Sequence, residues 1–124
     1  MREPVGSTED PPWIAHYPPG VRRTPPGPGH ATVPALLEAA VARFAERPAI
    51  DFAATRLSYA ELAARVEDAA GRLAGLGLGP GRTAALYLPN TAWHPVLFFA
   101  ALRIGARVAH LSPLDAGRVL AHKL

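Results

Sequence analysis

The feature of the sequence that most restricts its fold is a pair of short apolar segments that flank an apolar stretch of helical length. The segments are TAALYL at 83–88 and RVAHL at 107–111. TAALYL is nearly continuously apolar, which is typical of a strand covered on both faces. The stretch between them, from about Ala92 to Ile104, is apolar almost all round, which indicates a helix buried on more than one side. The sequence therefore predicts a right-handed, parallel β-α-β unit.

A helix and a hairpin are predicted upstream of this unit. Apolar residues recur at helical spacing from about Val33 to Glu46, Thr32 suits the N-cap, and Pro34 falls in the first turn. We expect Pro48 to end this helix. The short segments AIDF and ATRL that follow it are typical of two paired strands.

The segment SYAE at 58–61 is a capping-box sequence and marks the start of another helix. The Ser58 hydroxyl can accept a hydrogen bond from the Glu61 amide, while the Glu61 carboxylate accepts one from the Ser58 amide. Apolar spacing carries this helix to about Ala74.

The glycine-rich run GLGLGPG at 75–81 resembles a phosphate-binding loop at first sight. Phosphate loops of the dinucleotide and P-loop types leave a strand and open a helix, so that the helix N-terminus faces the anion. This run follows a helix and precedes a strand. We expect Gly75 or Gly77 to close the helix and Pro80-Gly81 to form a turn.

An extended leader is predicted before the α/β domain, and a further helix is predicted at its end. Residues 1–30 hold eight of the 14 prolines and predict an extended leader without helix or ladder, whose Trp13, Ile14 and Tyr17 are suited to hold it against a surface. A last helix is expected to begin at Ser112 or Asp115, with an apolar side made of Val119, Leu120 and Leu124. Because the sequence stops inside this helix and two strands leave sheet edges open, we interpret residues 31–124 as the truncated opening of a larger α/β domain.

Composition excludes several classes of protein. The formal net charge is +3, but the twelve arginines are spread along the chain, which argues against a nucleic-acid interface. There is no cysteine, and therefore no disulfide or thiolate site. The N-terminus lacks the apolar stretch of a signal peptide, and the longest fully apolar run, 96–102, is far shorter than a membrane span. We expect a cytoplasmic location.

From Trp13 onward the sequence resembles the N-terminal part of adenylate-forming acyl-CoA synthetases, the AMP-binding ligases, and among them long-chain fatty-acid–CoA ligases. The likeness is carried by these segments in this order: PWIAHYPPGV, VPALLEAAVARFAERPAIDF, LSYAELAARVEDAAGRLAGLGLGPG, LYLPNTAWHPVLFFAALRIGARV and PLDAGRVLAHKL. Departures from the family pattern include Arg82, where the family usually has aspartate, and His110 and Ser112, where asparagines are common.

The resemblance implies a two-step reaction. A carboxylate attacks the α-phosphate of ATP, and coenzyme A then displaces AMP from the acyl-adenylate, with Mg²⁺ neutralising the phosphates. The family uses a Ser/Thr/Gly-rich loop ending in Pro-Lys-Gly, an acidic motif and a lysine in a C-terminal domain. None of these occurs here, and the one lysine, Lys123, has no glycine-rich loop around it. We therefore expect no catalytic, cofactor-binding or metal-binding residue in this chain.

Individual residues offer weaker alternatives. The five histidines, His16, His30, His94, His110 and His122, include no pair at the helical spacing of a zinc site. His110 is the best placed, because ligands of open α/β sheets gather at the carboxyl ends of strands. Asn90 lies at such an end too, although capping of the next helix by Asn90 or Thr91 is the simpler interpretation.

The remaining candidates have ordinary structural interpretations. The aromatic residues Trp93, Phe98 and Phe99 could line an acyl pocket, but aromatics of a buried helix are usually core. Asp51 and Glu61 are not expected to act as paired carboxylates, because Glu61 already serves the capping box.

Three functional hypotheses follow from the sequence. The first is an N-terminal portion of a fatty-acid–CoA ligase, inactive alone, whose partner is the remainder of that enzyme or a second copy of the chain. The alternative is a small non-catalytic binding or oligomerisation module derived from such a ligase. The third, a free-standing adenylating enzyme, is disfavoured because the ATP-binding loop and the catalytic lysine domain are missing.

Overall fold

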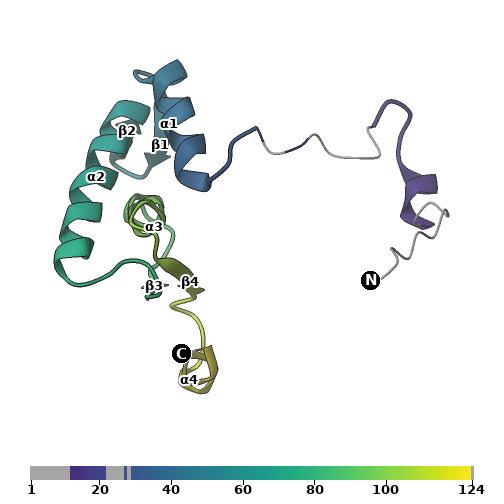
Figure 1. Cartoon of the computed structure of the whole chain (residues 1–124). Coiled ribbons are helices and arrows are strands. Elements are labelled where there is room, and N and C mark those ends of the chain that lie inside the picture. The colour runs from purple at the N-terminus through teal and green to yellow at the C-terminus, as the bar shows by residue number, and fades with distance from the viewer. Residues whose placement is uncertain (1–11, 22–26, 28, 124) are drawn as a thin grey trace, which may run out of the picture.

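The computed structural model describes residues 12–21, 27 and 29–123. Helices and strands alternate along this part of the chain (Figure 1). In order they are η1 (Pro12–His16), α1 (Val33–Phe44), β1 (Pro48–Phe52), β2 (Thr55–Ser58), α2 (Tyr59–Gly75), β3 (Thr83–Tyr87), α3 (Trp93–Arg103), β4 (Arg107–Leu111) and α4 (Gly117–Lys123).

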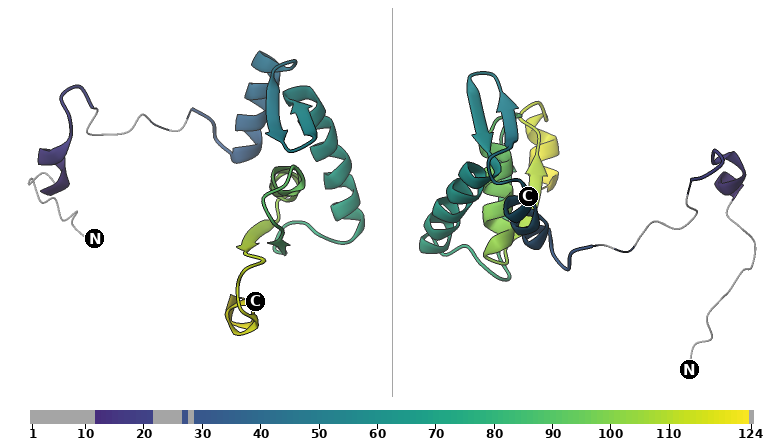
Figure 2. Two further views of the ribbon diagram at one scale, coloured as in Figure 1. Left: turned by 180° about the vertical axis from the view of Figure 1, so that it is seen from behind. Right: turned by 90° about the horizontal axis from the view of Figure 1, so that it is seen from above.

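The central element is α3, which packs against α1 and α2 on one side and against β3 and β4 on the other (Figure 1). The hairpin of β1 and β2 lies against α2, as the view from behind also shows (Figure 2). Beyond β4 the chain leads to α4, which extends away from the helices at the bottom of Figure 1. The predicted burial of α3 on more than one side is confirmed.

Both predicted strand pairings are present. β1 and β2 are antiparallel, with Asp51 opposite Arg56. β3 and β4 are parallel, from Thr83 opposite Arg107 to Tyr87 opposite Leu111. The chain therefore has the mixed α/β architecture with a parallel β-α-β unit that the apolar pattern indicates.

The hydrophobic core lies where the three long helices meet. Its buried members come from the apolar stripes of α1 and α2 and from one side of α3: Leu37, Leu62, Val66, Ala69, Ala70, Val96 and Ala100. Val96 is 1% exposed and Ala100 is fully buried, because small side chains let α3 approach α2 closely.

The first two long helices begin at the predicted caps. The Thr32 hydroxyl accepts a hydrogen bond from the Ala35 amide at 3.2 Å, and Ser58 and Glu61 form both bonds of the capping box. The end of α1 differs from the prediction: the helix closes at Phe44, and Pro48 instead opens β1. The Arg47 amide bonds the Phe44 carbonyl in a tight turn, so the chain leaves the helix before proline requires it.

The glycine-rich run after α2 is structural, as predicted. Gly77, with φ of +85°, donates to the Ala74 carbonyl at 2.9 Å, and Leu78 donates to the Leu73 carbonyl at 3.1 Å. These two bonds form a Schellman motif, which requires a left-handed residue after the helix. Gly81, with φ of +79°, then occupies the position after Pro80 in a type II turn.

The predicted start of α3 near Ala92 is confirmed, but its predicted cap and the predicted start of the last helix are wrong. Neither Asn90 nor Thr91 caps α3: its N-cap is Ala92, and no side chain among the described residues caps it. The Thr91 carbonyl instead accepts from the His94 amide at 3.1 Å, so a backbone turn takes the place of a side-chain cap. The last helix begins at Gly117 rather than Ser112 or Asp115, because those two residues form the turn that precedes it.

The leader and the sheet differ from expectation in two further ways. Pro12–His16 form a short 3₁₀ helix, which tolerates Pro12 because the first position needs no amide donor. Trp13 remains 59% exposed, so the described part of the leader is not held by burial of this ring.

β3 is not covered on both faces, since Tyr87 is 49% exposed. Leu124, expected on the apolar side of the last helix, lies outside the described residues.

Each helix in the part of the chain that the structure describes is too short or too polar to cross a membrane.

Candidate functional site

The carboxyl ends of β3 and β4 lie side by side, because parallel strands end at the same edge of a sheet. The loops that leave these strands line an open cavity of about 630 Å³. Its lining combines imidazole, amide, hydroxyl and amino groups with apolar walls, from Leu88, Pro89, Asn90, His94, His110, Leu111, Ser112, Pro113, Leu114 and Lys123. We refer to this cavity as the strand-end site.

Two histidines meet at the strand-end site. The Nδ1 atom of His110, on β4, lies 3.1 Å from the Nε2 atom of His94, in the first turn of α3. Their ring centroids are 5.0 Å apart, and the ring of Phe98 packs against His110 with centroids 5.5 Å apart. The fold therefore brings together two imidazoles that are 16 residues apart in the sequence.

Lys123, which lines the strand-end site, forms an ion pair with Asp115, which does not line it. The Nζ atom of Lys123 lies 2.6 Å from Oδ2 of Asp115. The hydrogen bond from Lys123 holds the pKa of the Asp115 carboxyl below its usual value, so this residue stays ionised near neutral pH. The pair leaves the site with little net charge from these two residues.

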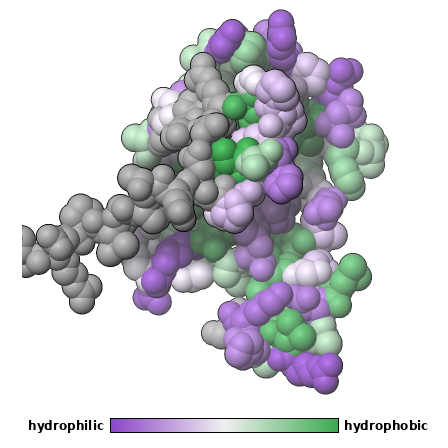
Figure 3. All heavy atoms as spheres, turned by 90° about the vertical axis from the view of Figure 1, so that its right-hand side faces the viewer, coloured by the Kyte–Doolittle hydropathy of each residue, from purple (hydrophilic) through white to green (hydrophobic). Residues whose placement is uncertain are grey.

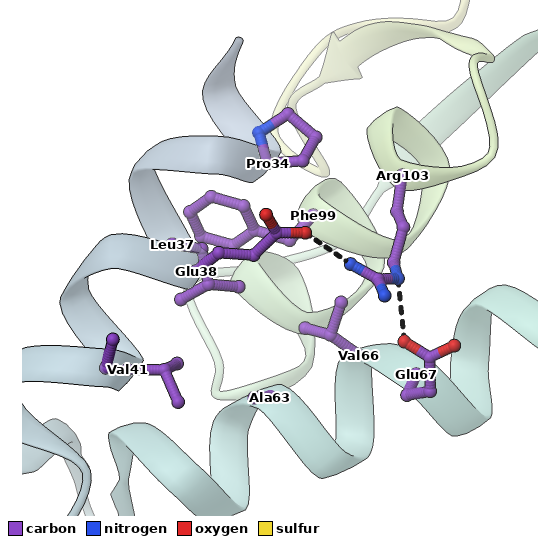
Figure 4. Close-up of a pocket in the computed structure, with 10 residues that line it drawn as sticks. Pro34, Leu37, Glu38, Val41, Ala63, Val66, Glu67, Phe99 and Arg103 are labelled. Carbon is purple, nitrogen blue, oxygen red and sulfur yellow. Dashed lines mark hydrogen bonds and ion pairs between the residues drawn. The ribbon is translucent and has the colours of Figure 1, made fainter. Parts of the chain in front are cut away.

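A second hollow, of about 430 Å³, lies between α1, α2 and α3 (Figure 4). Its walls are mostly apolar and include Leu37, Val66 and Phe99. Arg103 stands at its rim, where the guanidinium bonds Glu38 at 2.9 Å and Glu67 at 2.7 Å (Figure 4). Arg103 thus ties α3 to both other long helices.

One face of the molecule shows hydrophobic residues beside hydrophilic ones (Figure 3). Val33 and Leu36, on α1, are 43% and 51% exposed. Exposed apolar residues of this kind make a surface that a further part of a protein can cover.

The structure separates the predicted histidines into two groups. His94 and His110 meet at the strand-end site, whereas His16 and His30 do not line it, and His122 lies in the last turn of α4. His110 was identified from the sequence as the best placed of the five. Its partner was missed, because His94 is joined to it only by tertiary folding. No group of three or more potential metal-ligating residues forms within the described residues.

The structure also places Asn90 and the three aromatic residues that were considered for an acyl pocket. Asn90 lines the strand-end site, as its place after β3 suggests. Trp93 is 56% exposed and is therefore not part of the core. Phe99 packs against the core and lines the hollow between the helices, while Phe98 lies against Phe99 and His110.

The two carboxylates Asp51 and Glu61 serve separate local contacts. Asp51 lies 3.7 Å from Arg56 across the hairpin, and Glu61 accepts from the Ser58 amide at 2.8 Å. The contacts of Arg103 with Glu38 and Glu67 were not found from the sequence. Arg103 is 65 residues from Glu38 along the chain, so no local spacing signals that contact.

Comparison with known proteins identifies the family. The family model described as AMP-binding enzyme matches residues 37–124. The chain therefore belongs to the AMP-binding enzyme family, the adenylate-forming ligases.

Curated relatives include two kinds of acid-activating enzyme. The long-chain-fatty-acid–CoA ligase of Escherichia coli O157:H7 is 33% identical over 113 residues, which cover 90% of this chain and 20% of that enzyme. The salicyl-AMP ligase / salicyl-S-ArCP synthetase of Mycobacterium tuberculosis is 42% identical over 80 residues, covering 60% of this chain and 14% of the enzyme. The chain spans about a fifth of the length of the long-chain ligases it matches.

Solved structures show the same fold. The N-terminal subdomain of NpsA from Klebsiella oxytoca matches 74% of this chain and 24% of its own, with a TM-score of 0.72 and 24% identity. O-succinylbenzoate coenzyme A synthetase (MenE) from Bacillus subtilis, in complex with AMP, matches 71% and 23%, with a TM-score of 0.68 and 25% identity. The architecture is similar to that of about a quarter of each of these adenylate-forming enzyme chains.

Proposed function

We propose that the chain is the N-terminal portion of an ATP-dependent ligase that joins a fatty acid to coenzyme A. In this proposal residues 1–30 are a leader and residues 31–124 open the ligase domain. The complete enzyme uses ATP, Mg²⁺ and coenzyme A, and the partner of this portion is the remainder of the ligase.

The extent of the match to long-chain ligases supports the fatty-acid assignment. A match over 90% of the chain cannot be contained in residues 37–124, so the similarity to these ligases continues into the leader. The similarity to the salicyl-AMP ligase covers only 60% of the chain. The longer match to the long-chain ligases therefore supports a fatty acid as the substrate.

We further propose that the chain alone does not form an acyl-adenylate. Adenylation depends on groups that position the phosphates and neutralise their charge. The sequence has no Ser/Thr/Gly-rich loop ending in Pro-Lys-Gly, and Lys123, its one lysine, is paired with Asp115. The role of this portion is then to complete the fold around a catalytic centre that other residues supply.

Exchange of labelled pyrophosphate into ATP tests the inactivity. We expect no exchange above a protein-free blank with palmitate, oleate or salicylate at saturating ATP and Mg²⁺. The Escherichia coli long-chain ligase is the positive control for the fatty acids. Acid-dependent exchange by the isolated chain would overturn the proposal that it is inactive alone.

A chimera tests the class of acid. Residues 12–124 replace the matching segment of the Escherichia coli ligase, and the same ligase with that segment deleted serves as the control. We expect the chimera to activate palmitate and the deletion to be inactive. Activation of salicylate in preference to palmitate would reject the fatty-acid assignment. A chimera that folds and binds ATP but activates neither acid would reject the proposal that this portion completes the ligase.

A further inference from the structure

We propose that His94 and His110 together bind one divalent transition-metal ion of the Zn²⁺ class at the strand-end site. This ion is distinct from the Mg²⁺ that accompanies ATP. Imidazole nitrogens favour zinc, copper and nickel, whereas magnesium prefers oxygen ligands. The proposal does not depend on the proposed function.

The separation of the two nitrogens fits a shared ion. Zinc–imidazole bonds are about 2.0–2.1 Å long, so two such nitrogens stand about 2.9 Å apart at a right angle and about 3.3 Å apart at a tetrahedral angle. The observed distance between His110 Nδ1 and His94 Nε2 is 3.1 Å, which lies between these values. An ion bound to both nitrogens would lie to one side of the line that joins them, in place of the hydrogen bond between the two rings.

The packing around the histidines favours binding of an ion without rearrangement of the fold. His110 is fixed in the parallel register, opposite Leu86, and His94 lies in the first turn of α3. The ring of Phe98, one turn further along α3, lies against the exposed ring of His110. Because both imidazoles project from regular secondary structure and already face one another, little ordering of the chain is needed to bind an ion.

The surroundings of the pair are compatible with a cation. Lys123 is the cationic residue lining the cavity, and its charge is balanced by Asp115 at 2.6 Å. The Asn90 amide and the Ser112 hydroxyl line the same cavity and offer oxygen atoms. Two imidazoles fill two of the four positions of a tetrahedral zinc ion and leave two for water or for an anionic ligand.

Equilibrium dialysis of the tag-free chain against ZnCl₂ tests the proposal at pH 7.5 in the presence of millimolar MgCl₂. We expect one Zn²⁺ per chain. His94→Ala and His110→Ala should each weaken binding by at least about tenfold, since either change removes one of two ligands. The matched control is the double variant His16→Ala/His30→Ala, which removes two histidines that do not line the cavity and should bind as the wild type does.

Imidazole ¹⁵N resonances give a second readout on the wild-type chain, which keeps the test valid if a variant fails to fold. Stoichiometric Zn²⁺ should shift the Nε2 signal of His94 and the Nδ1 signal of His110 together. The proposal is overturned if the wild type binds no Zn²⁺, if the shifts appear on other histidines, or if folded single variants bind as tightly as the wild type.

Discussion

The capping box at the start of α2 lowers the pKa of the Glu61 carboxyl. Its carboxylate accepts from the Ser58 amide at 2.8 Å, and the Ser58 hydroxyl accepts from the Glu61 amide at 3.2 Å. The backbone hydrogen bond from Ser58, followed by its hydroxyl contact, lowers the pKa of Glu61 below 4.5. Hydrogen bonds to an ionised carboxylate favour the charged form.

The lowered pKa predicts how stability depends on pH. Because the folded pKa lies below the unfolded value, the contribution of the Glu61 charge is present above about pH 4.5 and is lost as the pH falls through the folded pKa. Glu61→Gln keeps a capping-box acceptor but does not titrate. We expect the free energy of unfolding of the wild type to exceed that of the variant near pH 7, and the difference to shrink toward pH 3.

The control is Ser58→Ala, which removes the hydroxyl half of the box and should cost about 1 kcal/mol of folding free energy near neutral pH. Urea unfolding at both pH values measures all three proteins. A gap between the wild type and Glu61→Gln that is as large at pH 3 as at pH 7 would contradict the assignment.

At the scale of the elements, the ends of the helices are set by backbone geometry. α2 and α3 both close with a Schellman motif whose left-handed residue is a glycine, Gly77 and Gly105 respectively. In the second motif Gly105 donates to Leu102 at 3.1 Å and Ala106 to Ala101 at 3.0 Å. This closure turns the chain from α3 directly into β4, and so places His110 opposite the start of α3.

Gly105→Ala should destabilise the chain by at least about 1 kcal/mol, because a side chain at positive φ is strained. The backbone has φ of +75° here, and a Cβ atom would lie 3.2 Å from Cγ of Pro80. Gly71→Ala is the matched control: it lies inside α2 with nothing within 4 Å, and it should stabilise by about 0.5–1 kcal/mol. Chemical denaturation compares the two, and equal effects of the same sign would be inconsistent with this account.

At the scale of the whole molecule, two different interactions join the three long helices. The core around Val96 is buried, whereas Arg103 is 39% exposed and its partners Glu38 and Glu67 are more than half exposed. Apolar burial contributes about 25 cal/mol per Å². Exposed ion pairs contribute at most about 1 kcal/mol each. The buried core therefore contributes most of the stability of the packing between the three long helices. The ion pairs of Arg103 mainly fix how α3 is oriented relative to α1 and α2.

Val96→Ala and Arg103→Met test whether the core contributes more to stability than the Arg103 ion pairs. Val96→Ala leaves a cavity between α2 and α3 and should cost about 2 kcal/mol or more. Arg103→Met keeps the apolar stem of the side chain while removing both ion pairs, and should cost less than about 1 kcal/mol at moderate ionic strength. Urea unfolding monitored by circular dichroism measures both, and the order would be refuted by a larger loss in Arg103→Met.

Much of the fold was predictable because its signals are local. The capping box at Ser58, the cap at Thr32 and the hairpin of β1 and β2 depend on residues a few positions apart, and all are present. The parallel pairing of β3 and β4 joins more distant residues, but the apolar helix between the two strands indicates it. The predictions failed where local signals compete. At the start of α3 a backbone turn forms in place of a side-chain cap by Asn90 or Thr91. At the end of α1 a turn closes the helix before Pro48 is reached.

From α1 onward the sequence by itself determined the type and order of the elements, because apolar periodicity, caps and glycine positions act over one or two turns of chain. The order strand, helix, strand indicated the parallel β-α-β unit, and a series of matching segments indicated the family. Only the tertiary structure decided which side chains meet. His94 approaches His110, and Arg103 joins Glu38 and Glu67, across sequence separations that no periodicity spans. The physical reason is that such contacts depend on how α3 packs against its neighbours, and this packing is determined jointly by all the elements in contact.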